Sequence, residues 1–241
     1  LMDEVGFNVF KYRNYYNGGG VAIGDINSDY LPDVYLVANN KSNRLYINKG
    51  NMQFKDVTKD AGVAGSHKWS TGVCMVDING DGLLDIYVCN SGNIKGDSRA
   101  NELFINQGSE SGEIPTFIEA ATDYGIDDNS FSTHAAFFDY DNDGDLDLYV
   151  LNNAFRAIST FDLSKNLRHK RDLYGGDKLY RNDGGVFKDV SEITGIYGSV
   201  IGFGLGLMVA DVNNDNWMDI YVANDFFERD YLYINNQDGT Y

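Results

Sequence analysis

The chain has 241 residues, a formal net charge of −17, 43% hydrophobic residues and 14% aromatic residues. This length and hydrophobic content suit one sizeable core and exclude a disordered chain in spite of the acidity. Phosphate binding needs a basic face that this composition does not supply, which excludes nucleic acid as a partner. No run of about 18 apolar residues is present that could span a membrane.

Residues 1–16 mix aromatic and polar side chains without a clear period. We interpret them as a lead-in segment that packs on the first repeat or completes a neighbouring one. Residues 17–241 repeat the same sequence pattern and predict a partial β-propeller. Its repeats are expected at about 17–66, 67–128, 129–198 and 199–241. Because no targeting signal precedes Leu1, we expect a processed or partial chain.

Each repeat contains a nine-residue acidic loop, and the most acidic is DYDNDGDLD at 139–147. Positions one, three, five and nine are predicted to supply side-chain oxygens to a cation, and position seven its backbone carbonyl, with a sharp turn at position six. The predicted metal ligands are Asp25, Asn27, Asp29, Leu31, Asp33, Asp77, Asn79, Asp81, Leu83, Asp85, Asp139, Asp141, Asp143, Asp145, Asp147, Asp211, Asn213, Asp215, Trp217 and Asp219.

Donor chemistry favours calcium in these loops, at up to four sites. Only oxygen ligands are present, and calcium takes about 6 to 8 of them in flexible geometry, whereas magnesium requires a stricter octahedron. A single acidic loop could be accidental, but four in register could not. An EF-hand would need a glutamate at position twelve, where the third loop has Val150, and flanking helices, where Leu148 to Leu151 predict a buried strand.

Four strands are expected in each repeat. A small-residue strand precedes the loop, and an apolar strand ending in Asn follows it and is expected to be buried on both faces. Strands such as Leu45-Tyr46-Ile47-Asn48 and Phe54-Lys55-Asp56-Val57 complete the repeat. This pattern predicts all-β structure and propeller blades. The fourth repeat stops at Tyr241, so we expect an incomplete last blade and a larger propeller.

Two loops depart from the pattern at the turn position. Tyr30 and Asn216 stand where the other loops have glycine. Asn tolerates positive φ, whereas Tyr30 requires either a strained positive φ or another loop geometry. Cys74 and Cys89 flank the second loop, where the other repeats have small or apolar residues, and are expected to be buried thiols or a disulfide.

The third repeat carries the largest insertion, at about 154–175, and the clearly basic stretch of the sequence lies there. One interpretation is a loop that binds a protein or glycan partner, since long loops on rigid scaffolds often carry function. The other is a short solvated helix whose charges offset an acidic neighbour. The candidate partner-binding residues are Arg156, Lys165, Arg168, His169, Lys170 and Arg171.

The loop DINGDGLLD, followed by IYV, resembles the FG-GAP or VCBS repeats, calcium-loop propellers related to integrin alpha-subunit heads. The recurring LYINxG and FKDVTxxAGV are similar to the cartilage acidic protein family and its bacterial relatives, which often carry an ASPIC/UnbV-type domain. The match runs through residues 17–241. The resemblance implies an exported calcium-binding propeller. In a bacterium, it implies that the propeller belongs to a complex on the surface of the outer membrane.

Two functions from different classes fit these features. The first is a non-enzymatic binding or scaffold module at the cell surface or outside the cell, where free calcium suffices for weak structural sites with dissociation constants of about 10⁻⁴ to 10⁻³ M. The alternative is a lyase-like enzyme acting on an acidic polysaccharide, which needs a base and a neutralising cation in a cleft. Arg156, Arg168, His169 and Tyr174 are the candidates for such a set.

Overall fold

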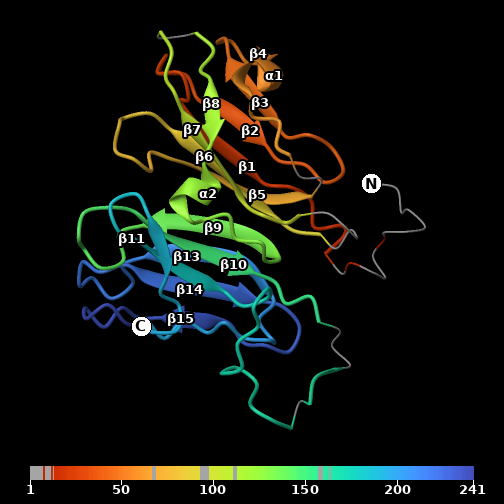
Figure 1. The fold of residues 1–241 in the computed structure, drawn as a ribbon, viewed down its shortest axis with the longest axis vertical. Helices are drawn as coiled ribbons and strands as arrows, with labels where there is room; N and C mark the ends of the chain where they lie inside the picture. The colour runs from red at the N-terminus through yellow and green to blue at the C-terminus, as the bar shows by residue number, and fades with distance from the viewer. Residues whose placement is uncertain are drawn as a thin grey trace. The chain divides into compact units, whose positions relative to one another are not determined.

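The computed structural model describes residues 8, 12, 14–66, 69–92, 98–110, 113–156, 160–162 and 164–241. The chain divides into two compact units, Leu1–Asp128 and Asn129–Tyr241 (Figure 1). Within the described residues each unit contains two antiparallel sheets, whose strands neighbour one another in chain order. The prediction of an all-β, propeller-like fold is confirmed.

The first unit holds two four-stranded sheets. One consists of β1 (Val21–Gly24), β2 (Asp33–Leu36), β3 (Arg44–Asn48) and β4 (Phe54–Asp56). The other consists of β5 (Ser70–Val76), β6 (Asp85–Asn90), β7 (Glu102–Asn106) and β8 (Phe117–Glu119). A one-turn helix follows the last strand of each sheet, α1 (Thr58–Ala61) and α2 (Ala121–Tyr124).

The second unit holds a four-stranded and a three-stranded sheet among its described residues. The four-stranded sheet consists of β9 (Ser132–Phe138), β10 (Asp147–Asn152), β11 (Lys178–Asn182) and β12 (Phe187–Asp189). The three-stranded sheet consists of β13 (Gly204–Ala210), β14 (Asp219–Asn224) and β15 (Tyr231–Tyr233). Among the described residues, the last sheet has one strand fewer than the other three, as predicted.

The core of each unit lies between its two sheets. Apolar residues from both sheets form one cluster in the first unit, and aromatic residues such as Tyr149 and Tyr233 enlarge the cluster in the second. Strands β6 and β10 are buried at every residue, as expected. In β2 and β14, however, Leu36 and Tyr221 are each 40% exposed.

Close approach of neighbouring sheets explains the small-residue strands. A Cβ on Gly20, just before β1, would lie 3.1 Å from the Cα of Gly72 in β5. A Cβ on Gly204 in β13 would overlap the side chain of Leu151 in β10. Both contacts are closer than ordinary packing allows. Glycine near the start of these first strands therefore allows neighbouring sheets to approach closely.

The helices α1 and α2 were not predicted. They occupy stretches where the sequence indicated only a closing turn at Gly62 or Gly125, whose φ values are +79° and +75°. Asp56 assists the first helix by accepting hydrogen bonds from the backbone N–H and the hydroxyl of Thr58, at 3.0 and 2.6 Å. Such local side-chain bonds favour helix starts. Among the described residues, no helix is long and apolar enough to cross a membrane.

Two further expectations concern residues near β5 and β6. Tyr12 and Tyr15 of the lead-in pack against Trp69, with ring centroids 5.5 and 5.2 Å apart. Most of the remaining lead-in lies outside the described residues. Cys74 and Cys89 are free thiols, and burial raises the pKa of Cys74 to about 12.

Candidate functional site

The four acidic loops connect the first strand of a sheet to the second. The last residue of each loop is already in the second strand and pairs with the end of the first. These pairs are Gly24 with Asp33, Val76 with Asp85, Phe138 with Asp147 and Ala210 with Asp219. The predicted ligands of each loop are therefore held together at one end of a hairpin.

The position-one aspartate organises its loop through backbone hydrogen bonds. In the second loop, Asp77 accepts a bond from the N–H of Asp81 at 3.0 Å and another from Gly82 at 2.8 Å. The same pair of bonds occurs in the other three loops. Sequence reasoning assigned this residue to the metal alone, although the tendency of Asp to bond nearby backbone N–H groups could have indicated the second role.

Positions four and six both have positive φ in every loop. The angles are +58° and +67° at Ser28 and Tyr30, +72° and +85° at Gly80 and Gly82, +57° and +99° at Asn142 and Gly144, and +61° and +68° at Asn214 and Asn216. Tyr30 thus adopts the glycine conformation, and the loop geometry does not change. Its side chain is 94% exposed, so side-chain packing does not offset the strain.

The position-nine aspartate is buried and doubly hydrogen-bonded. In the third loop, Asp147 accepts bonds from the N–H of Tyr140 and of Asn182, both at 2.9 Å. Asp33, Asp85 and Asp219 repeat this arrangement, and all four residues are at most 1% exposed. Each oxygen retains a lone pair that can meet a cation.

The third loop fits a hard cation best among the described residues. One carboxylate oxygen from each of Asp139, Asp141 and Asp147 lies within 4.8 Å of the others. Asp141 Oδ1 and Asp145 Oδ1 are buried without a hydrogen-bond partner, and so is Asn27 Oδ1 in the first loop. Buried oxygens of this kind are costly unless a cation or donor meets them, so these residues fit calcium.

Electrostatics in the loops supports the same fit. Burial raises the pKa of Asp147 to about 7, and the charges of Asp141 and Asp145 raise it further against the effect of its backbone bonds. Burial likewise raises the pKa of Asp85 to about 6. Burial favours the protonated form of these carboxyl groups, and a bound divalent cation would favour their ionised form.

The position-seven residues are placed by the carboxylate two residues earlier. The N–H groups of Leu31, Leu83, Asp145 and Trp217 donate to Asp29, Asp81, Asp143 and Asp215 at 2.8 to 3.1 Å. The position-three amides of Asn27, Asn79 and Asn213 donate to the second oxygen of the same aspartates in their loops. Ligation by the position-seven carbonyls stays a prediction.

An asparagine at the end of the third strand links neighbouring loops, a role that sequence reasoning missed. The Asn106 amide donates to the carbonyl of Leu84 in the loop of its own sheet at 3.1 Å and to that of Ile26 in the preceding loop at 3.0 Å. In the second unit, Asn235 donates to Tyr140 of the preceding loop at 2.8 Å. The recurrence of Asn in LYIN was the available signal. We call Asn106 and Asn235 the bridging asparagines.

The described part of the basic insertion packs tightly on the second unit. Arg168 forms an ion pair at 2.6 Å with Glu228, whose side chain is fully buried. Arg171 donates to the carbonyl of Ile196 at 2.8 Å, and the His169 ring meets Tyr197 edge to face. These contacts give three of the six candidate partner-binding residues a packing role.

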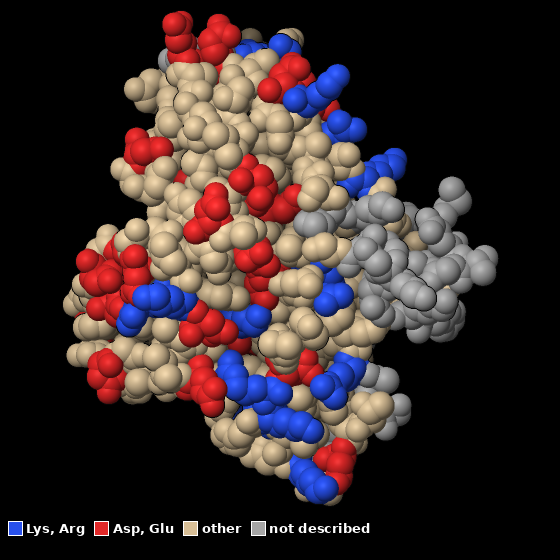
Figure 2. Space-filling view, viewed as in Figure 1, with Lys and Arg blue, Asp and Glu red and all other residues tan. Residues whose placement is uncertain are grey.

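The other three candidates line one pocket. Arg156 pairs with Asp172 at 2.5 Å and Lys165 with Asp162 at 3.0 Å. Together with Lys170 they contribute to the wall of a pocket of about 280 Å³. Figure 2 shows Lys and Arg gathered low in the view, where Figure 1 draws this insertion. The interpretation of the insertion as a short solvated helix is not supported, because its described residues contain no α-helix.

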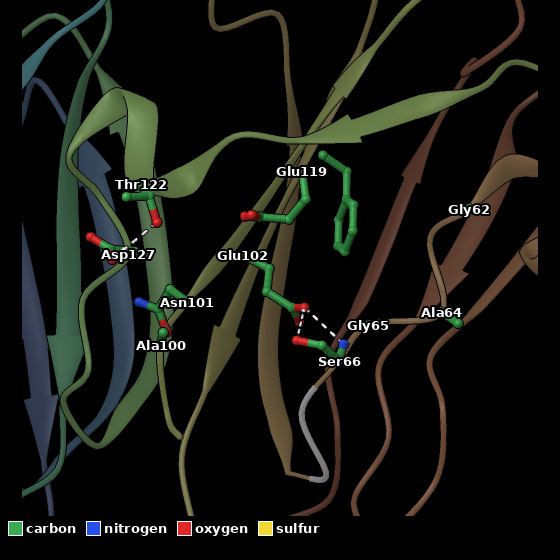
Figure 3. A pocket seen from close by; sticks show the side chains of 11 residues that line it. Gly62, Ala64, Gly65, Ser66, Ala100, Asn101, Glu102, Glu119, Thr122 and Asp127 are labelled. Atoms are coloured by element: carbon green, nitrogen blue, oxygen red, sulfur yellow. Dashed lines mark hydrogen bonds between the residues drawn. The ribbon is translucent and has the colours of Figure 1, made fainter. Parts of the chain in front are cut away.

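A larger pocket of about 540 Å³ lies in the first unit, beside the turn that follows α1 (Figure 3). Glu102, Glu119 and Asp127 line it, but Glu102 accepts bonds from the backbone N–H and hydroxyl of Ser66, both at 2.8 Å. Glu119 accepts bonds from the backbone N–H groups of Leu103 in β7 and of Ala121 at the start of α2, at 3.2 and 3.0 Å. At least two of these carboxylates therefore hold neighbouring turns in place.

Known proteins share sequence with much of this chain. Residues 25–88 match the family model described as FG-GAP-like repeat. Cartilage acidic protein 1 is 32% identical in Mus musculus and 31% in Homo sapiens, each over 184 residues that make up 73% of this chain. The chain spans about a quarter of these relatives, 27% and 26% of their length. The predicted resemblance to FG-GAP repeats and cartilage acidic protein is confirmed.

Solved structures match the fold as well, and one of them has a carbohydrate-binding protein as its subject. It is described as the structural basis of the recognition of non-reducing terminal N-acetylglucosamine by an Agrocybe aegerita lectin. The match covers 97% of this chain and 54% of the lectin chain at 17% identity, with a TM-score of 0.46. A similarity of this size does not indicate a shared ligand.

Proposed function

We propose that this chain is a calcium-stabilised propeller module that binds a protein or glycan partner outside the cell or at its surface. It carries an FG-GAP-like repeat and is a relative of cartilage acidic protein 1. The observation that carries the proposal is the third loop, where three carboxylates converge and two carboxylate oxygens are buried without a partner. Bound calcium would supply the missing positive charge and complete the loop.

The same hairpin arrangement supports up to four sites. The side chains of Asp or Asn at positions one, three, five and nine would hold the ion in every loop, with the backbone carbonyl of position seven. The ion's contribution is structural, because it neutralises acidic side chains at the hairpin ends. Each site would stabilise the folded chain by about 1.8 kcal/mol if free calcium is about twenty times the dissociation constant.

The geometry of the insertion favours binding over catalysis. Arg168 is engaged by Glu228 and His169 packs on Tyr197, so two members of the proposed enzymatic set are committed to packing. Neither residue is placed as a base beside a cation in a cleft. A partner surface on the insertion is consistent with the remaining cations Arg156, Lys165 and Lys170.

Thermal unfolding in millimolar calcium, in excess chelator and in magnesium tests the structural role of the ion. We expect calcium, but not magnesium, to raise the Tm. Asp141→Asn should reduce the number of bound calcium ions by one, counted by native mass spectrometry, whereas the control Asp183→Asn outside the loops should leave the count unchanged. Equal Tm values in calcium and chelator would overturn the calcium proposal.

A further inference from the structure

The basic insertion forms a pocket that is separate from the metal loops. Its volume is about 280 Å³, which is close to the lower limit for small-molecule sites. The residues that line it are Arg156, Thr160, Phe161, Asp162, Lys165, Leu167, Lys170 and Val200. Three cations therefore surround one carboxylate in a chain whose formal net charge is −17.

The cations differ in how they are engaged. Arg156 and Lys165 each face a carboxylate, Asp172 and Asp162, but both cationic side chains remain more than half exposed. Lys170 is exposed, and the described residues offer its ammonium no carboxylate partner. An anion in this pocket would therefore meet one uncompensated charge and two more close to it.

One side of the pocket is apolar and fixed to the core. Phe161 and Leu167 pack against the buried cluster that contains Val200 and Phe203. The Phe161 ring lies 6.2 Å from the ring of Phe203 and 6.2 Å from that of Phe227. A ligand held by the cations would therefore rest one face on aromatic and aliphatic carbon.

The backbone around the pocket is held in place before any ligand binds. The carbonyl of Lys170 accepts a bond from Val200 N–H at 2.9 Å, and the N–H of Asp172 donates to Gly198 at 2.7 Å. The Arg168–Glu228 ion pair ties the same segment to the loop between β14 and β15. Preorganised sites lose less entropy on binding.

We propose that this pocket binds one carboxylate- or sulfate-bearing sugar residue of an acidic polysaccharide. Lys170, with Arg156 and Lys165 beside it, would hold the anionic group, Asp162 would accept a sugar hydroxyl, and Phe161 would contact the apolar face of the ring. A bare phosphate would leave that apolar side unused. The inference rests on the proposed binding role but not on the calcium sites.

Titration calorimetry on the full chain tests the proposal. The probes are a galacturonate tetrasaccharide for carboxylates and a size-matched dextran sulfate for sulfates, with uncharged dextran and poly-glutamate as comparisons. We expect one or both anionic sugars to bind, and Lys170→Gln to weaken binding by roughly tenfold, the size of one charged hydrogen bond. Lys55→Gln, an exposed lysine in the other unit, removes the same charge and should leave the affinity unchanged.

Three results would overturn the proposal. One is equal weakening by Lys170→Gln and Lys55→Gln, which would indicate non-specific attraction. Another is equal affinity for uncharged dextran. The third is tighter binding of poly-glutamate than of either sugar, which would point to an acidic protein partner instead. Because sugar affinity and the calcium-dependent Tm are measured separately, failure of one proposal is distinguishable from failure of the other.

Discussion

At the scale of single residues, the position-nine aspartates carry two functions at once. Asp33, Asp85, Asp147 and Asp219 close their own loop through one oxygen and fasten the third strand of the sheet through the other. A carboxylate that accepts two backbone N–H bonds in a buried place is a structural element in its own right. We therefore expect metal-free loops to keep their hairpin register.

Asp177 allows a test of pH dependence outside the metal loops. It is 4% exposed and accepts hydrogen bonds from Asn152 N–H and the Tyr149 hydroxyl, yet burial raises its pKa to about 7. Because the raised pKa favours the protonated form in the folded state, its contribution to stability is largest below about pH 4 and is lost as the pH rises through about 7.

Asp177→Asn should therefore remove part of the loss of stability between acid and neutral pH. Asn43 and Asn101 hold the corresponding place in the first unit and accept the same backbone bond. Between about pH 4.5 and 7.5, the free energy of unfolding of the wild type, measured with denaturant, should fall by roughly 3 kcal/mol relative to that of the variant, since each pH unit below the folded pKa is worth about 1.4 kcal/mol. The exposed control Glu192→Gln should gain nothing, and a similar gain there would contradict the assignment.

At this scale the sequence located the four loops, because Asp and Asn recur there at fixed intervals, and the structure places each loop at the end of a hairpin. Ligation of a cation by these residues stays a prediction. The conformation of Tyr30 was not decided by its sequence neighbours. It follows from the hydrogen bond between its N–H and Asp25, which imposes the glycine conformation.

At the scale of elements, the hairpin and its bridging asparagine form the working unit. Asn106 is 2% exposed and uses its amide for the loop of its own sheet, the preceding loop and the turn at Gly108. Asn48 is the corresponding residue of the first sheet and is only partly buried, and its side-chain amide bonds to Pro32 and to the turn at Gly50. The two residues therefore make a matched pair.

Asn106→Ala should lower the free energy of unfolding by about 3 kcal/mol, at about 1 kcal/mol for each lost hydrogen bond. Asn48→Ala should cost about half as much, because fewer partners are left unsatisfied in a wetter place. Equilibrium denaturation in calcium measures both values. Equal losses would show that the bond to the preceding loop adds nothing.

The insertion shows where sequence reasoning on elements reached its limit. Its charge was visible, but its structure depends on contacts such as Arg168 with Glu228, 60 residues apart, and on Phe161 against Phe203 and Phe227. The local periodicity of apolar residues does not predict contacts between residues so far apart in the chain. The strands, in contrast, followed from apolar runs bounded by Gly and Asn, and only the one-turn helices α1 and α2 were overlooked.

At the scale of the whole molecule, the acidity is concentrated in the predicted calcium loops. Four bound calcium ions would reduce the formal net charge from −17 to −9. Like charges at this density destabilise a compact state, and salt screens them over about 10 Å at 0.1 M. The stability of the metal-free chain should therefore depend more on salt than that of the loaded chain.

This expectation is checked by measuring the Tm across a sodium chloride series from about 20 to 200 mM, over which the screening length falls several-fold. In chelator the Tm should rise with salt, and in calcium the rise should be clearly smaller. Sucrose at matched osmolality serves as the uncharged control. Parallel curves in chelator and calcium would show that the loops are not the source of the repulsion.

The bridging asparagines also bear on how such a chain can grow. In each unit the second repeat brings a donor for the loop before it, as Asn106 with the carbonyl of Ile26 and Asn235 with that of Tyr140 show. A tandem duplication therefore arrives with both halves of its junction already encoded. Copying or losing whole repeats can change the length of the array in evolution without inventing a new contact.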